Sequence, residues 1–324
     1  MTTPPWLRWL DPLTAMILAV LVLGLLVPVP DGVAVVLDGV RTGAIVLLFF
    51  LYGARMPTGE VVDGLKRFRL QGSMLGATYL LFPVLGLLVQ LLPDAVLAED
   101  LRRGVLYLSL LPSTVQSSVV LTSVARGNVA GAITGATISN VLGVVLTPVL
   151  VAVLMGATGA GLDGGAVTGI LVQLLLPFVV GQVAQRWIGP WLRKHAKITK
   201  VTDRATILLV VFTAVSEAQS SGAWGDLTVV SLVVLLVVCA VLLAVMLLAT
   251  WRGGKLLGLD RGDRIALLMC GSKKSAATGL PMAAVLFSPA LAASVALPVI
   301  AFHQLQIVVC AILARRLARE AETA

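Results

Sequence analysis

Apolar residues dominate this chain in long runs that are separated by short polar segments. A helix needs about 20 apolar residues to cross the hydrocarbon core of a bilayer. Ten runs reach or approach this length, and we predict a membrane-spanning helix over each of them: 13–30, 38–55, 70–92, 104–125, 128–156, 165–188, 205–221, 227–250, 264–288 and 290–313. The pattern therefore predicts an all-α polytopic membrane protein with ten transmembrane helices.

The composition supports a membrane protein with one domain. Of the 324 residues, 58% are hydrophobic and 12% are charged, whereas soluble domains average about 45–50% and 25%. No polar stretch approaches the roughly 50 residues of an independent soluble domain, so we expect residues 1–324 to form a single membrane domain. The net charge of +8 comes from basic residues without interleaved aromatic side chains, a pattern that gives no support to a nucleic-acid partner.

The basic residues set the expected orientation, because Lys and Arg concentrate on the cytoplasmic side of membrane proteins. With a cytoplasmic N-terminus, ten spans place 19 of the 24 basic residues inside and three outside. Only Lys273 and Lys274 remain, and they fall within the ninth span. If they formed an aqueous loop, the count would drop to nine and Arg315, Arg316 and Arg319 would lie outside. We therefore expect both lysines within the membrane and both termini in the cytoplasm. Abundant Ala, Val, Leu and Gly with short loops suggest a bacterial inner membrane.

Polar interruptions occur at corresponding places in the two halves of the chain. The fourth span reads LSLLPSTVQSSVVLTSVARGN, with Pro112 before a polar cluster, and the ninth reads LLMCGSKKSAATGLPMAAVLF, in which Gly271, Gly279 and Pro281 bracket the lysines. Inverted repeats of five helices predict this correspondence, and such transporters bind solutes near the midplane between broken helices. The alternative is ordinary helix packing with local kinks.

Three segments carry a resemblance to a known family. LPSTVQSSVVLTSVARGNVAGAITGATISNVLGVVLTP (111–148), CGSKKSAATGLPMA (270–283) and FHQ (302–304) resemble the bile acid:sodium symporter superfamily, most closely its SBF-like branch with the solute carrier 10 member 7-type proteins. The resemblance implies a single transporter domain with inverted repeats at approximately 11–157 and 163–316. It also implies that the fourth and ninth spans are unwound and cross, in a panel and a core that move against each other.

The resemblance, together with the polar residues of the broken spans and Glu217 as a candidate counter-ion, gives a set of candidate site residues. Candidate substrate-binding residues are Thr114, Gln116, Ser117, Lys273, Lys274, Thr278, His303 and Gln304. Candidate ion or coupling residues are Ser118, Thr134, Thr137, Asn140, Glu217, Ser272 and Ser275. Sodium-coupled relatives are expected to have a carboxylate where this chain has Ser272, followed by further cation ligands where it has lysines. This difference disfavours a sodium site, and we expect no cofactor and no metal.

The two lysines require compensation within the membrane, because a charge at the bilayer centre costs about 2.5–3.5 kcal/mol on insertion scales. Glu217 is a candidate counter-ion, and a lysine that releases its proton would let a proton replace sodium as the coupling ion. The leading hypothesis is a secondary transporter of an organic anion, either a bile-acid-like molecule or a small carboxylate or sulfated solute. It would work by alternating access, coupled to protons or uncoupled.

Two alternatives remain open from the sequence. One is a regulatory or scaffold membrane protein that keeps the transporter fold, and the other is a sodium-coupled symporter with altered ligands. An enzyme is not expected, because the chain lacks H-E-x-x-H, G-x-S-x-G and a phosphate-binding glycine loop. The expected partners are a small organic anion, a coupling proton or sodium ion, and the lipid bilayer.

Overall fold

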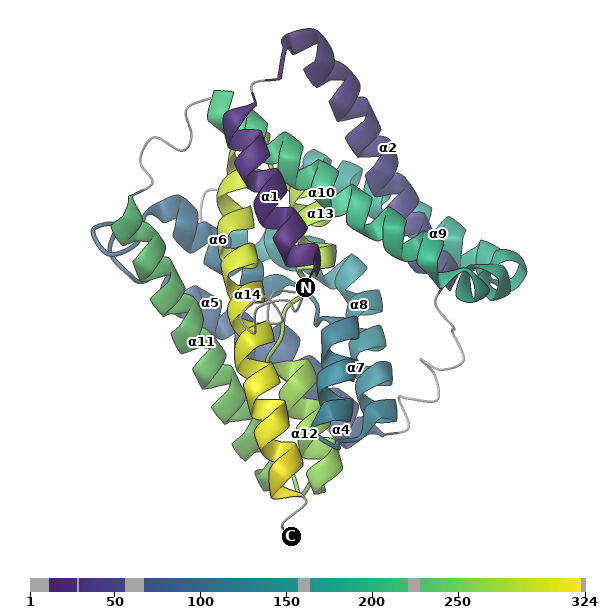
Figure 1. Cartoon of the computed structure of the whole chain (residues 1–324), viewed down its shortest axis with the longest axis vertical. Helices are drawn as coiled ribbons and strands as arrows, with labels where there is room; N and C mark the ends of the chain where they lie inside the picture. The colour runs from purple at the N-terminus through teal and green to yellow at the C-terminus, as the bar shows by residue number, and fades with distance from the viewer. Residues whose placement is uncertain (1–11, 28, 56–66, 157–163, 221–227, 322–324) are drawn as a thin grey trace, which may run out of the picture. The chain divides into compact units, whose positions relative to one another are not determined.

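The computed structural model describes residues 12–27, 29–55, 67–156, 164–220 and 228–321 (Figure 1). The regular elements of these residues are all helical, as the hydrophobic runs predict. They are α1 (Pro12–Leu26), α2 (Asp31–Arg55), α4 (Phe68–Gly76), the π-helical η2 (Ala77–Leu81), α5 (Phe82–Val89), α6 (Glu99–Leu110), α7 (Val115–Val124), α8 (Val129–Leu150), the π-helical η3 (Val151–Met155), α9 (Gly164–Lys194), α10 (Ala196–Ser220), α11 (Val229–Leu256), α12 (Arg261–Gly271), α13 (Ala276–Leu286) and α14 (Pro289–Glu320).

Each predicted span falls on one helix or on consecutive helices. Within the described residues, five helices are long and apolar enough to cross a membrane, and a sixth span is reached if α6 and α7 are counted together. On α11, Val233, Val237 and Val241 are more than half exposed at intervals of four residues, which is the apolar outer face expected toward lipid. The protein is therefore a multi-pass membrane protein, while the count of ten spans and the inverted repeats stay predictions.

Both interruptions predicted from the sequence are real breaks. Helix α6 ends at Leu110 and α7 begins at Val115, with a bend of 66° between them. Proline lacks the N–H that would continue the helical ladder, so the break falls at Pro112. The second break separates α12 from α13 between Gly271 and Ala276. We expected Gly279 and Pro281 to mark the end of the second break, and this was wrong. Both lie inside α13, because the helix resumes directly after Ser275.

The chain divides into two compact units, of which the first contains Met1–Met56, Ile170–Leu227 and Leu280–Ala296. In it α1 and α2 pack against α10, and α2 meets α9 backbone to backbone. A Cβ atom added at Gly53 would lie 2.0 Å from the carbonyl oxygen of Phe178, and one added at Gly181 would lie 2.0 Å from that of Phe50. Glycine at these positions allows the close helix approach that is common in membranes.

The second unit contains Pro57–Gly169, Thr228–Gly279 and Leu297–Ala324. Its central element is α12, which packs against α4, α7, α8 and α11. The C-terminal part of α14 lies along α12 (Figure 1), where Cys310, Ala314 and Leu317 pack into a buried cluster with Ile265 and Met269. Each unit takes elements from both predicted repeats. Both helix breaks belong to the second unit, which therefore holds the candidate site.

Candidate functional site

The break after α6 leaves a row of backbone carbonyl groups without helical donors, and each of them is paired elsewhere. Leu110 accepts from Thr147 Oγ1 at 2.8 Å, Pro112 from the Ser275 N–H at 2.8 Å and Ser113 from Asn140 Nδ2 at 2.7 Å, while Ser109 and Leu111 both accept from Lys274 Nζ at 2.7 Å. An unpaired carbonyl in a dry interior costs several kcal/mol. The donors from α8 and from the second break therefore stabilise the interruption.

The break after α12 is satisfied in the same way, by hydroxyl groups of the first break. Ser118 Oγ donates to the Met269 carbonyl at 2.9 Å, Ser113 Oγ to that of Cys270 at 2.6 Å and Thr114 Oγ1 to that of Lys274 at 2.8 Å. The two breaks thus lie against each other and complete each other's hydrogen bonds. Thr114 and Ser118, which the resemblance suggested as ligands, hold the two broken helices together.

The hydrogen bonds that the Lys274 ammonium group makes to described residues all go to backbone carbonyl groups. Its side chain is 1% exposed, and Nζ donates to the carbonyl oxygens of Thr78, Ser109 and Leu111 at 2.8, 2.7 and 2.7 Å. The ammonium also lies 4.3 Å from the centre of the Phe82 ring. An ammonium has three N–H donors, so all donors of Lys274 are used. A charge-assisted hydrogen bond is about twice as strong as a neutral one.

Lys273 differs sharply from its neighbour. It is completely buried, yet the one hydrogen bond of Nζ found in the described part of the chain is a long contact of 3.4 Å to Ser117 Oγ. The ion pairs between described residues include neither lysine. Because consecutive residues point in different directions, only Lys274 reaches the carbonyl groups. Lys273 is left as a buried cation with donor capacity to spare.

Gln306 closes the site from α14 and was missed by the sequence reasoning. Its Oε1 accepts from the Lys274 backbone N–H, and its Nε2 donates to the Lys274 carbonyl, both at 2.8 Å. These two bonds fix the orientation of the amide. Nε2 is therefore also the donor to His303 Nδ1 at 2.9 Å, which places the proton of a neutral His303 ring on Nε2. The signal in the sequence was the spacing of three residues between His303 and Gln306, which puts both on one helix face.

A chain of hydroxyl and amide groups links α8 to the start of α13. Thr278 Oγ1 and Ser275 Oγ are 3.0 Å apart, Thr278 Oγ1 donates to Asn140 Oδ1 at 3.0 Å, and Ser275 Oγ caps α13 by accepting from the Thr278 N–H at 3.2 Å. Ser272 Oγ turns back to the Leu268 carbonyl of its own helix. The structure thus brings the candidate residues Asn140, Ser275 and Thr278 together and leaves Ser272 outside this network.

Other predicted residues lie away from these contacts. Gln116 is exposed, while Thr134, Thr137 and Gln304 are partly buried. Among the residues that the structure describes, no hydrogen bond joins Gln116, Thr134 or Thr137 to the breaks. Glu217 belongs to the first unit, where it is exposed and interacts electrostatically with Arg41. The proposed pairing of Glu217 with a lysine stays a prediction.

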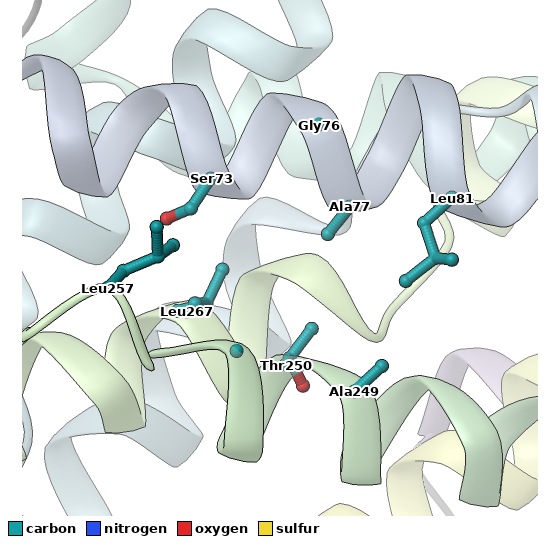
Figure 2. Close-up of a pocket in the computed structure, with 9 residues that line it drawn as sticks. Ser73, Gly76, Ala77, Leu81, Ala249, Thr250, Leu257 and Leu267 are labelled. Carbon is teal, nitrogen blue, oxygen red and sulfur yellow. The ribbon is translucent and has the colours of Figure 1, made fainter. Parts of the chain in front are cut away.

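An apolar pocket of about 220 Å³ lies elsewhere in the second unit. Figure 2 shows Ser73, Ala77 and Leu81 on one side of it and Ala249, Thr250 and Leu267 on the other. Both hydroxyl groups are used within their own helices: Ser73 Oγ donates to the Leu70 carbonyl at 2.8 Å and Thr250 Oγ1 to the Met246 carbonyl at 2.7 Å. No charged residue lines the pocket, so it is unsuited to an ionic ligand.

A multi-pass helical membrane protein whose two broken helices meet around buried polar groups has the architecture of a secondary transporter. Residues 11–319 match the SBF-like CPA transporter family (DUF4137). The chain is 40% identical over 315 residues to the putative symporter YfeH of Escherichia coli K12, covering 97% of this chain and 95% of that protein. It is 42% identical over 317 residues to the uncharacterized protein PA2026 of Pseudomonas aeruginosa, with the same coverage.

Similarity extends to animal proteins. The chain is 27% identical over 276 residues to the rat sodium/bile acid cotransporter 7, covering 83% of this chain and 80% of that protein. The chain therefore belongs to the SBF-like CPA transporter family. It is a membrane transporter and not an enzyme, and the resemblance inferred from the three motifs is confirmed.

Proposed function

We propose that this protein is a secondary transporter of an organic anion and that Lys273 binds the anionic group. The observation that carries the proposal is the state of Lys273: it is completely buried, and among the described residues its Nζ makes a single long hydrogen bond, to Ser117 Oγ. A buried ammonium without a counter-charge is costly. An anion that binds beside Lys273 supplies the counter-charge. We therefore expect the site to prefer negatively charged solutes.

The first turn of α7 supports the same site. Thr114 is the N-cap residue of α7, but its side chain makes no capping bond; its hydroxyl is directed to the Lys274 carbonyl, to which it donates. The first N–H groups of α7 are thus uncapped, and Ser117, the partner of Lys273, lies in that turn. Uncapped helix N-termini attract anions through their free N–H groups and the helix dipole. We infer that a carboxylate or sulfate group binds between Lys273 and this turn.

The coupling ion follows from the same residues. We propose that coupling is to protons or absent. Ser272 stands where the resemblance implies a carboxylate, and its hydroxyl is used by the Leu268 carbonyl. The nitrogen of the Lys274 side chain already occupies three carbonyl oxygens of this region. The names of the animal relatives refer to sodium and bile acid. The experiment below therefore compares proton coupling with sodium coupling.

We further propose that transport occurs by alternating access in ten spans with both termini in the cytoplasm of a bacterium. The support for the orientation is the distribution of the basic residues. The support for alternating access is the division of the chain into two units. The first unit takes α1, α2 and α10 with most of α9, whereas both broken helices contribute their meeting points to the second. This division corresponds to a panel and a core drawn from both repeats, in which the core carries the site.

Uptake by reconstituted protein tests the proposal. Proteoliposomes are given a conjugated bile acid, a sulfated steroid or a small monocarboxylate, each in sodium or potassium and with or without a pH gradient. We expect Lys273→Gln to lower uptake by at least about tenfold, since it removes a charge-assisted contact worth about 1.5–3 kcal/mol. Lys255→Gln, at an exposed lysine of α11, is the matched control and keeps full uptake.

The opposite outcome is equally clear. Uptake that requires sodium and survives the double change Lys273→Ala and Lys274→Ala contradicts both the anion site and the proposed coupling. If no anion is taken up and none raises the unfolding temperature, the scaffold alternative is favoured instead.

A further inference from the structure

The three carbonyl groups around Lys274 Nζ are oriented by backbone features that do not depend on the lysine. In an α-helix the Thr78 carbonyl would accept from the N–H of Phe82, but in the π-helical turn Phe82 donates to Ala77. The next candidate donor is Pro83, which has no N–H. The Thr78 carbonyl is therefore free for a partner from outside its helix, whatever residue occupies position 274.

The other two carbonyl groups are freed by the break after α6. Ser109 would pair with the N–H of Ser113, which instead donates to Ser139 Oγ at 3.0 Å. Leu111 has extended backbone, with ψ of 155°, at the point where α6 ends, so its carbonyl leaves the helical direction. Two independent interruptions, in η2 and after α6, thus present three oxygens to one point.

The chemistry of this point is that of a cation site. It contains three carbonyl oxygens at 2.7–2.8 Å from the nitrogen and the face of the Phe82 ring at 4.3 Å. Carbonyl rings replace the hydration shell of monovalent cations in membrane proteins, and aromatic faces attract ammonium groups. The distances are typical of charge-assisted N–H to oxygen bonds, which favours an ammonium ion with directed donors.

We infer that the carbonyl groups of Thr78, Ser109 and Leu111, together with the Phe82 ring, form a binding site for a monovalent ammonium-type cation that the chain fills with its own Lys274. The wild-type protein carries this cation covalently and needs no free ion there. Removing the side chain beyond Cβ empties the site, and ammonium or methylammonium from solution then takes the place of Nζ. The inference does not rest on the proposed substrate.

Thermal unfolding of purified Lys274→Ala tests this site directly. The variant is compared with wild type in tetramethylammonium, ammonium and methylammonium chloride at equal ionic strength. Tetramethylammonium has no N–H donor and serves as the inert background. We expect Lys274→Ala to be destabilised in tetramethylammonium and to gain about 2 °C at a cation concentration tenfold above Kd, whereas wild type gains nothing because its site is full.

Lys274→Met is the matched control. The Met side chain fills the space of the Lys274 side chain without a charge. The variant is therefore destabilised but does not respond to ammonium or methylammonium. If Lys274→Ala does not fold without a cation, its recovery as monodisperse protein in methylammonium but not in tetramethylammonium becomes the measurement, with the same prediction.

Several results would overturn the inference. They are a Lys274→Ala variant as stable as wild type without added cation, a variant that no cation stabilises or recovers, and an equal response of wild type or Lys274→Met to methylammonium. Because unfolding needs no transported solute, these results leave the anion site at Lys273 to be judged by uptake alone.

Discussion

Gln306 provides a direct test of how the break after α12 is stabilised. It is fully buried and pairs with both the N–H and the carbonyl group of Lys274 at 2.8 Å. In Gln306→Leu the Lys274 carbonyl keeps its bond from Thr114 Oγ1, but the buried N–H loses its acceptor. An unsatisfied buried donor costs about 1–3 kcal/mol and the second bond about 0.5–1.5 kcal/mol. We expect a loss of about 2–4 kcal/mol in the free energy of unfolding.

Gln306→Glu separates the two bonds. A carboxylate or carboxyl group still accepts from the Lys274 N–H, but an ionised Glu places a second acceptor against the Lys274 carbonyl. We expect a loss as large as that of Gln306→Leu if the bond to the carbonyl matters most, and a smaller one if the N–H dominates. Gln185→Leu, at a partly buried position of α9, is the control and is expected to change stability by less than about 1 kcal/mol.

The chain contains its own reporters for this measurement. Cys239, Cys270 and Cys310 are free and buried, so a thiol-reactive fluorophore labels them only as the protein unfolds. A loss of 2–4 kcal/mol corresponds to a fall of roughly 3–6 °C in Tm for a chain of this length. If Gln306→Leu unfolds within about 1 °C of wild type, the reciprocal bonds to Lys274 do not stabilise the break after α12.

Two further substitutions test the packing of each unit. Gly181→Ala should lower Tm strongly, since its Cβ would lie 2.0 Å from the Phe50 carbonyl oxygen, whereas Gly72→Ala, with nothing within 4 Å, should be neutral or stabilise by up to about 1 kcal/mol; equal Tm values for the two variants would contradict the close contact of α2 and α9. Tyr107→Phe removes the 2.6 Å bond from the phenol to the Gly279 carbonyl and should cost about 0.5–1.5 kcal/mol by the same thiol-labelling assay, and an unchanged Tm would show that this bond contributes nothing.

Much of the fold was predictable because its causes are local. Long apolar runs can satisfy their backbone in a membrane only as helices, so the helices follow from composition and run length. Pro112 fixes the first break to within a residue or two, because the missing N–H acts on its own helix. The second break was predicted on weaker grounds. Gly279 and Pro281 suggested an interruption that continues past the lysines. Ser275 instead caps a new helix that begins at Ala276, before both of these residues.

The site was predictable only in part. The three motifs identified most of the residues that meet at the two breaks, including Asn140, Thr278 and His303. They assigned ligand roles to Thr114 and Ser118, whose hydroxyl groups donate to the carbonyl groups of Lys274 and Met269. A hydroxyl that satisfies a distant backbone group has the same sequence signature as one that binds an ion, because in both cases it stands alone in an apolar helix.

By itself, the sequence determined that this protein is a helical membrane transporter with two interrupted helices, since hydrophobic length and the backbone chemistry of proline act locally. Only the tertiary structure decided how the adjacent lysines differ. The carbonyl groups that take Lys274 come from Thr78, Ser109 and Leu111, more than 160 residues earlier in the chain. No local pattern can show which of two neighbouring ammonium groups such distant oxygens will reach, so the division between a filled cation site and an unpaired buried charge exists only in the folded protein.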